Sequence, residues 1–92
     1  SLEELKRIAD QLSDQENTLI ILGNKNESTG NWVIKSNNEA LADASDILKK
    51  LLSYSGGKGG GKARFSQGVQ ANSGLMNKAI SDVLKSLNLQ KT

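Results

Sequence analysis

A run of glycines constrains the fold of this chain more than any other feature of its sequence. Five of the six residues from Gly56 to Gly61 are glycine, and Lys58 and Lys62 lie within the run and directly after it. Glycine adopts backbone conformations that other residues avoid and leaves amide groups unshielded. Because a helical pattern precedes the run and an alternating pattern follows it, we expect an ordered, turned loop at 56–62 rather than a slack linker. Amide and ammonium groups gathered in this way suit phosphate oxygens.

Apolar periodicity before the run predicts a helix and two strands. Apolar residues recur at spacings of three and four from Leu2 to Leu12, which is typical of an amphipathic helix. A continuous apolar run from Thr18 to Leu22 indicates a strand that is covered on both faces. Residues 32–34 are predicted to form a second strand, paired with the first as a hairpin.

The rest of the chain is predicted to add a long helix, a strand and a final helix. Ser36 and Glu39 fit a capping box, which places the start of the long helix at Ser36, and Gly56 is expected to end it. Alternation from Ala63 to Val69 is typical of a strand with two different faces, and the last helix is expected to be capped by Asn72 or the next residue. The predicted fold class is therefore α+β: a small mixed sheet of about three strands covered by helices, in the order α-β-β-α-β-α.

Length and two missing residue types limit the functions that this chain can perform alone. Its 92 residues suffice for one small domain. The sequence contains no Cys and no His, which excludes disulfide frameworks, thiolate and imidazole catalysis, and zinc sites built from those residues. We therefore expect no catalytic residues, no metal and no cofactor. No apolar run approaches the ~20 residues of a membrane span, so we expect no membrane partner.

Charge is distributed unevenly along the chain. Residues 1–46 carry four bases and nine acids, whereas residues 47–92 carry eight bases and one acid, so the halves have net charges of −5 and +7. Five bases of the second half fall within sixteen positions that contain no acid: Lys49, Lys50, Lys58, Lys62 and Arg64. Such a cluster predicts a patch that follows a phosphate backbone, although an ordinary solvated helix face is an equal alternative for Lys49 and Lys50.

Aromatic residues are too few to form a stacking platform for bases. The three are Trp32, Tyr54 and Phe65. We expect Trp32 and Phe65 in the core, while Tyr54 could either pack or stack. Recognition of RNA would then depend on its shape and backbone.

The segment from Gly56 to Gly68, GGKGGGKARFSQG, resembles the signature of the DHHA1 domain in its alanyl-tRNA synthetase form. In that form a triple glycine is followed by a basic residue, a Pro, and shortly afterwards a Phe or Met, a small residue and Gln. Ala63 departs from the usual Pro, and Val69 and Gln70 replace a second glycine cluster. In DHH-type phosphoesterases a His follows the triple glycine, so Lys62 and Gln67 favour the synthetase form.

The resemblance implies a noncatalytic domain that grips the outer corner of a tRNA, supporting aminoacylation and editing by other domains of an alanine–tRNA ligase. The implied partners are a tRNA, specifically tRNA-Ala, and those other domains; a homodimer through an upstream helical segment is possible, and the location is cytoplasmic. We treat residues 1–92 as a single DHHA1-like domain, cut from a longer protein, with residues 1–16 as the tail of that helical segment. The expected nucleic-acid-binding residues are Lys49, Lys50, Lys58, Gly59, Gly60, Gly61, Lys62, Arg64 and Gln67.

Two other functions remain open at this point. The domain could be the substrate-binding part of a DHH-type phosphoesterase that acts on oligonucleotides or cyclic dinucleotides. It could also have lost RNA binding and serve as a protein-interaction or folding module.

Overall fold

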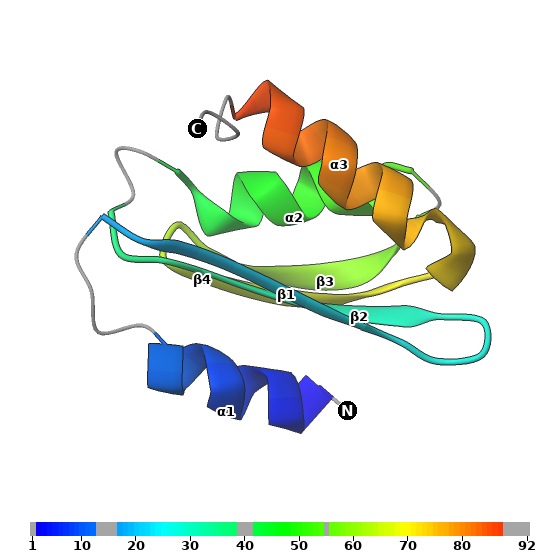
Figure 1. The fold of residues 1–92 in the computed structure, drawn as a ribbon, viewed down its shortest axis with the longest axis horizontal. Coiled ribbons are helices and arrows are strands. Elements are labelled where there is room, and N and C mark those ends of the chain that lie inside the picture. The colour runs from blue at the N-terminus through cyan, green and yellow to red at the C-terminus, as the bar shows by residue number, and fades with distance from the viewer. Residues whose placement is uncertain (1, 13–16, 39–41, 55, 88–92) are drawn as a thin grey trace.

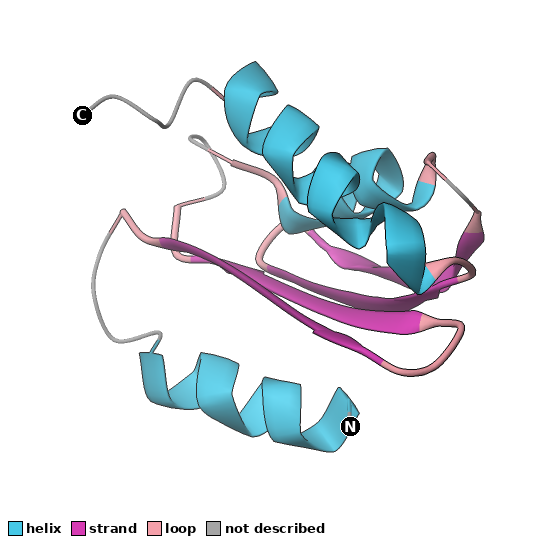
Figure 2. Cartoon of the chain, turned by 45° about the vertical axis from the view of Figure 1, so that its right-hand side comes forward, coloured by secondary structure: helices cyan, strands magenta, loops and turns pink. Residues whose placement is uncertain are grey.

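A computed structural model describes residues 2–12, 17–38, 42–54 and 56–87, which form one sheet between two layers of helices (Figure 1). The elements in chain order are α1 (Leu2–Leu12), β1 (Leu19–Lys25), β2 (Gly30–Ser36), α2 (Ala44–Leu52), β3 (Gly57–Lys62), β4 (Phe65–Gln70), a single 3-10 turn η1 (Ser73–Leu75) and α3 (Met76–Ser86). Helix α1 lies on one side of the sheet and the pair α2 and α3 on the other, as the rotated view in Figure 2 also shows. The predicted α+β class is confirmed.

The sheet has four strands rather than about three, and it is antiparallel throughout, in the order β1-β2-β4-β3. The additional strand is the glycine run, which pairs with β4 from Gly57 opposite Gln70 to Lys62 opposite Phe65. The expected loop is therefore an ordered edge strand. Glycine disfavours strands, so tertiary pairing with β4 overrides the local preference here. Gly56 alone behaves as expected, as a glycine that follows the end of the helix. Its φ is 84°, and its N–H donates to the carbonyl of Leu52, the last residue of α2.

Helix α2 begins at Ala44 with Asp43 as its N-cap, seven residues after the N-cap that the capping-box pattern predicted. Ser36 instead ends β2, and its hydroxyl donates to the Ala42 carbonyl at 2.7 Å. The cap is Asp43, whose Oδ1 accepts the N–H groups of Ser45 and Asp46 at 2.9 and 3.2 Å. The hydroxyl of Ser45 also donates to Asp43 Oδ1, and this hydrogen bond is the main cause of the lowered pKa of the Asp43 carboxyl. The two backbone hydrogen bonds lower this pKa further. Glu39 lies outside the described residues.

Each face of the sheet has its own apolar core. The larger core lies under α2 and α3, and its buried members are Trp32, Ile34, Ala44, Ile47, Leu48, Leu51, Met76, Ala79 and Val83. The smaller core lies under α1 and consists of Leu5, Ala9, Ile20 and Val33, with Leu22 and Phe65 against it. Ile20 belongs to the smaller core while Ile21 packs against the larger one, which confirms that β1 is covered on both faces.

The last helix follows a short turn rather than a direct cap. Oδ1 of Asn72 accepts the N–H of Gly74 at 2.9 Å and so caps η1, after which α3 continues from Met76. Of the predicted apolar stripe, Met76, Ala79 and Val83 are buried. Asn72 also accepts, at its carbonyl, the side-chain amide of Gln70, so the end of β4 and the start of α3 are tied together.

Candidate nucleic-acid interface

Strand β3 has two faces of different character. Gly57, Gly59 and Gly61 lie against β4, and a Cβ atom at any of the three would collide with its backbone. At Gly59 such an atom would lie 2.5 Å from the Gln67 carbonyl oxygen and 3.0 Å from Leu48 of α2. Gly60 differs, because among the described residues no atom lies within 4 Å of the position its Cβ would occupy. The odd-numbered glycines therefore allow β3 to approach α2 and β4, while Lys58, Gly60 and Lys62 point to the opposite side.

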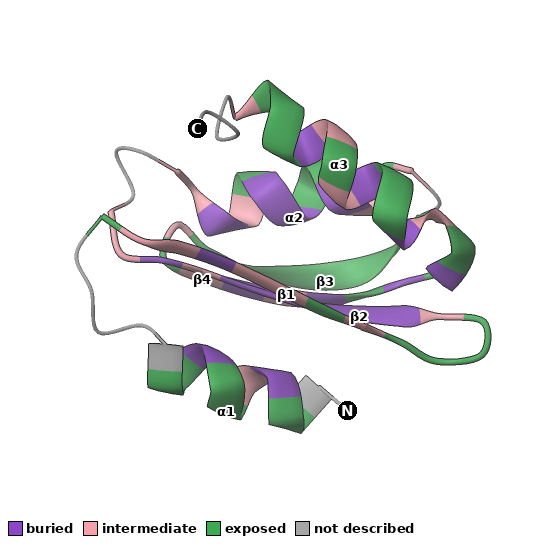
Figure 3. Ribbon diagram, in the orientation of Figure 1, coloured by how far each residue is buried: buried purple, intermediate pink, exposed green. Residues whose placement is uncertain are grey.

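On that opposite side, the part of the sheet beside β3 is not covered by α1. Helix α1 packs chiefly on β1 and β2, at the other end of the strand order (Figure 1). All of β3 is exposed, as Figure 3 shows. We call the surface formed by Lys58, Gly60 and Lys62 of β3 and by Gln67 and Val69 of β4 the open face. Register places Gly60 directly opposite Gln67, and Lys58 directly opposite Val69.

The open face has a positive charge that nearby acids do not neutralise within the described part of the chain. Lys58 and Lys62 are four residues apart on one side of a strand, a separation of about 13 Å, so they can contact different phosphates. Two of the acids of α1 already have cationic partners: Asp10 pairs with Lys35 at 2.9 Å, and Glu3 pairs with Lys6 at 3.8 Å. No ion pair involving Lys58 or Lys62 occurs among the described residues.

Gln67 carries an acceptor without a partner. Its Oε1 atom is buried and receives no hydrogen bond from the residues that the structure describes. Gln70, on the other face of the same strand, has a partner at each end of its amide: its Oε1 accepts the indole N–H of Trp32 at 2.7 Å, and its Nε2 donates to the carbonyl of Asn72. Leaving a buried acceptor unpaired costs about 1–3 kcal/mol. Among the described residues, Gln67 Oε1 therefore differs from Gln70 Oε1 in lacking a hydrogen-bond partner.

The structure brings together only part of the predicted cluster of bases. Lys58 and Lys62 share the open face, and Arg64 is exposed in the turn that joins β3 to β4. Lys49 and Lys50 are exposed in the last turn of α2, which covers the other side of the sheet. The five bases therefore do not form one patch. The spacing of Lys58 and Lys62, four residues apart with three glycines between them, was the sequence signal for this arrangement, but it becomes informative only once 57–62 is known to be a strand.

The aromatic residues are placed largely as predicted. Trp32 is 3% exposed in the larger core, and Phe65 packs against the smaller one. Tyr54 is half-buried, and its hydroxyl donates to Asp82 of α3 at 2.9 Å. This hydrogen bond raises the pKa of Tyr54 and is the main cause of the lowered pKa of Asp82, to which Lys78 also contributes. Tyr54 thus joins α2 to α3 rather than reaching the open face.

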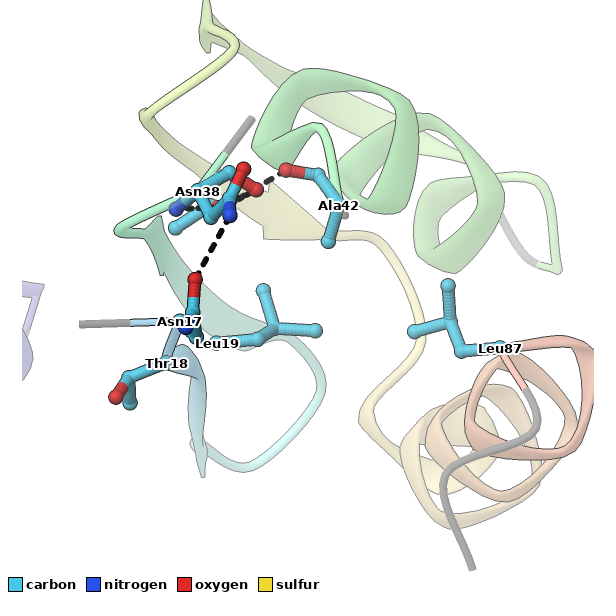
Figure 4. A pocket seen from close by; sticks show the side chains of 7 residues that line it. Asn17, Thr18, Leu19, Asn38, Ala42 and Leu87 are labelled. Carbon is cyan, nitrogen blue, oxygen red and sulfur yellow. Dashed lines mark hydrogen bonds between the residues drawn. The ribbon is translucent and has the colours of Figure 1, made fainter. Parts of the chain in front are cut away.

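A cavity of about 410 Å³ lies between the start of β1, the end of β2 and the end of α3 (Figure 4). Leu19, Ala42 and Leu87 form its apolar walls. Its polar groups are bonded to one another: Asn38 Nδ2 donates to Asn17 Oδ1 at 2.8 Å, and the Ser36 hydroxyl donates to the Ala42 carbonyl. These groups hold a structural corner of the fold, so the cavity is a weaker candidate site than the open face.

Two further observations concern the described residues alone. They contain no group of three or more His, Cys, Asp or Glu side chains that could hold a metal ion. Among their helices, none has both the length and the apolar character needed to cross a membrane.

Comparison with known proteins places the sequence near one enzyme family. Residues 1–89 match the sequence profile of the DHHA1 domain. The chain is 36% identical over 88 residues to an alanine–tRNA ligase of Francisella tularensis subsp. novicida, covering 89% of this chain and 10% of that protein. It is 31% identical over 91 residues to the corresponding ligase of Lactobacillus delbrueckii subsp. bulgaricus, covering 95% of this chain. It thus spans about a tenth of the length of the curated relatives it matches.

The fold has a counterpart among solved structures. The C-Ala domain from the alanyl-tRNA synthetase of Aquifex aeolicus superposes with a TM-score of 0.82 at 22% sequence identity, over 95% of this chain and 80% of that one. At this level of identity the likeness establishes the fold.

Proposed function

Because this chain belongs to the DHHA1 domain family, we propose that it is the noncatalytic tRNA-binding domain of an alanine–tRNA ligase. It grips the outer corner of tRNA-Ala and so supports aminoacylation and editing by other domains of that enzyme. The observation that carries the proposal is the placement of Lys58 and Lys62, which are exposed on one side of an edge strand and form no ion pair with any residue in the described ranges. Phosphate contacts from such lysines supply affinity that is largely independent of sequence.

The glycines of β3 support the same conclusion. With no side chain at Gly60, a ribose–phosphate backbone can approach the strand closely between the two lysines. β3 is also an edge strand, so half of its backbone N–H and C=O groups face outward. Arg64, in the adjoining turn, extends the positive surface beyond the end of the strand.

The proposal extends to the context of the domain. Its partners are the tRNA and the other domains of the ligase, its location is the cytoplasm, and residues 1–92 act as one domain. The proposal includes a homodimer of the ligase, formed through a helical segment of that enzyme. The phosphoesterase alternative is not favoured, because the relatives described above are alanine–tRNA ligases.

A titration with a tRNA-Ala transcript at about 50 and 200 mM salt tests the proposal. The double variant Lys58→Ala, Lys62→Ala is expected to weaken binding and to reduce the slope of log K against log salt by about 1–2. Lys25→Ala, Lys85→Ala is the matched control, since it removes the same charge from exposed positions of β1 and α3. Equal affinities and slopes for both double variants would contradict the proposed interface.

A further inference from the structure

The two edge strands of the sheet differ in how well they are protected against pairing with a further strand. β3 carries Lys58 and Lys62, and exposed lysines on an edge strand discourage such pairing. β1, at the other edge, has the sequence LIILGNK, in which the only charge is Lys25 at the end of the strand. The chain also contains no Pro that could interrupt a ladder. β1 is therefore the edge that can accept another strand.

Half of the backbone groups of β1 point away from the sheet. The Asn37 N–H donates to the Thr18 carbonyl at 2.9 Å, which fixes the residues at which β1 and β2 exchange hydrogen bonds. Because bonded and non-bonded pairs alternate along an antiparallel ladder, the even-numbered residues of β1 bond to β2. The odd-numbered residues from 19 to 25 direct their N–H and C=O groups outward.

Helix α3 turns an exposed apolar flank toward this edge. Asp82 faces α2, because it accepts the Tyr54 hydroxyl. Leu84 comes two residues later, about 200° further around the helix, so it lies on the flank away from α2, where it is 38% exposed. Ile80, one turn before Leu84, lines a cavity of about 290 Å³ together with Ile21 of β1. The flank that carries Ile80 and Leu84 therefore borders β1.

Helix α1 has a similar flank on the other face of the sheet. It packs on β1 and β2, and its Asp10 pairs with Lys35 of β2 at 2.9 Å, which turns that flank toward the inner strand. Ile8 lies about 200° away around the helix, on the flank nearer β1, and is 42% exposed. Among the described residues, the exposed large apolar side chains are those of Ile8, Leu84 and Val69. Two of these three thus border the β1 edge, one in each helical layer.

We propose that a second copy of the chain pairs its β1 with this edge, so that two four-stranded sheets join into one around a twofold axis. Antiparallel pairing over all seven residues of β1 places Ile21 opposite Gly23 of the second copy, so a large side chain meets a position that has none. Lys25 lies opposite Leu19, and no two like charges face each other along the strands. The contact belongs to the DHHA1 domain itself and is separate from the helical segment proposed above.

The extent of this contact is that of a weak, reversible dimer. One strand and one flank from each helical layer bury roughly 1,000 Å² over both copies, near the lower bound for a specific interface. We expect a dissociation constant on the order of 1–100 μM. The two β3 strands then lie at the outer ends of the joined sheet, so both open faces remain accessible.

Sedimentation equilibrium of the chain between about 5 and 500 μM tests the proposal, with an expected rise from 9.8 kDa toward twice that mass. Ile8→Lys and Leu84→Lys place like charges beside the twofold axis and are each expected to weaken the dimer at least about tenfold. Val69→Lys is the matched control, because it replaces an equally exposed apolar residue on the open face. Since all three positions are exposed, the three variants should melt within a few degrees of the parent.

A mass of 9.8 kDa at the highest concentration would overturn the proposal. A dimer that Val69→Lys weakens as much as Leu84→Lys does would also overturn it. None of these measurements requires RNA, so their outcome is independent of the proposed tRNA binding.

The chain contains no cysteine, so single cysteine variants can test the register. Leu22 lies on the twofold axis and forms a non-hydrogen-bonded pair with its counterpart, whose Cα separation of about 4.5 Å suits a disulfide. Leu22→Cys is expected to form a covalent dimer under mild oxidation, whereas Lys58→Cys, on the exposed β3 edge, is not. Failure of folded Leu22→Cys to cross-link, or cross-linking of Lys58→Cys alone, would overturn the proposed pairing. If Leu22→Cys does not fold, the sedimentation of the lysine variants decides.

Discussion

Gly59 and Gly60 are neighbours in β3 with opposite requirements. A methyl group at Gly59 would lie 2.5 Å from a carbonyl oxygen of β4 and 2.6 Å from Gly68 Cα, so backbone must shift to admit it. Gly59→Ala is therefore expected to lower the free energy of unfolding by about 1–3 kcal/mol, a Tm decrease of roughly 5–20 °C. Gly60→Ala is the matched control in thermal denaturation. Equal Tm values for the two variants would show that β3 does not lie against β4 as described.

The contact between Tyr54 and Asp82 links stability to pH. The hydroxyl of Tyr54 lowers the pKa of Asp82 below its ordinary value of 3.8. A carboxyl whose pKa is lower in the folded state stabilises the protein fully above the unfolded value, and this contribution is lost as the pH falls through the folded value.

Tyr54→Phe should therefore reduce the Tm most at pH 5–7, and by less at pH 2–3. Melting curves of parent and variant across this range test the expectation. If the Tm difference between the parent and Tyr54→Phe instead grew as the pH falls, the hydroxyl of Tyr54 would raise the pKa of Asp82 and not lower it.

Helix α1 depends on a small core of its own. Leu5 and Ala9 pack on Ile20 and Val33, separately from the larger core under α2 and α3. Leu5→Ala is expected to cost about 2 kcal/mol and to speed amide exchange in α1 while the amides of β2 stay protected. The buried Ile47 of α2 is the comparison, since Ile47→Ala should speed exchange throughout the sheet. Uniform loss of protection in Leu5→Ala would mean that α1 and the sheet unfold together.

The elements that were predicted correctly are those in which the pattern of apolar residues marks the side that is buried. The apolar spacing of α1 and α3 and the continuous run at the start of β1 are strong signals because core packing selects them directly. β3 has no such signal: its glycines are required by the atoms of β4 and α2 that lie against them, and that contact is nonlocal. The start of α2 was misplaced for a similar reason, because the Ser36 hydroxyl bonds to the Ala42 carbonyl instead of capping a helix.

The sequence named candidate site residues, but it did not show how the fold would arrange them. Lys58 and Lys62 were candidates from the basic cluster and Gln67 from the family resemblance, and the fold places the three on one side of the sheet. Sequence order also grouped Lys49 and Lys50 with them, although α2 carries these two on the other side of the sheet. That Gln67 Oε1 has no hydrogen-bond partner in the described part of the chain has no sequence signal, since it depends on which donors surround one atom.

Across the whole molecule, the sheet determines from which side a polyanion can approach. α1, with Glu3 and Glu4 in its first turn, lies at the β1–β2 end of the sheet, and the lysines of β3 lie at the other end. Lys49→Ala, Lys50→Ala should therefore weaken tRNA-Ala binding less than Lys58→Ala, Lys62→Ala does, although both remove two charges. Affinities measured at one salt concentration test this order. The reverse order would place the RNA against α2.

The residues of β3 alternate between a side that packs on the protein and a side that is exposed, and this has a consequence for protein engineering. Positions 57, 59 and 61 are fixed by the architecture, whereas 58, 60 and 62 are exposed on the other side of the strand. A library randomised at the even positions alone could retarget the domain to other ligands while the scaffold stays intact, so recognition and foldability can be varied independently within six consecutive residues.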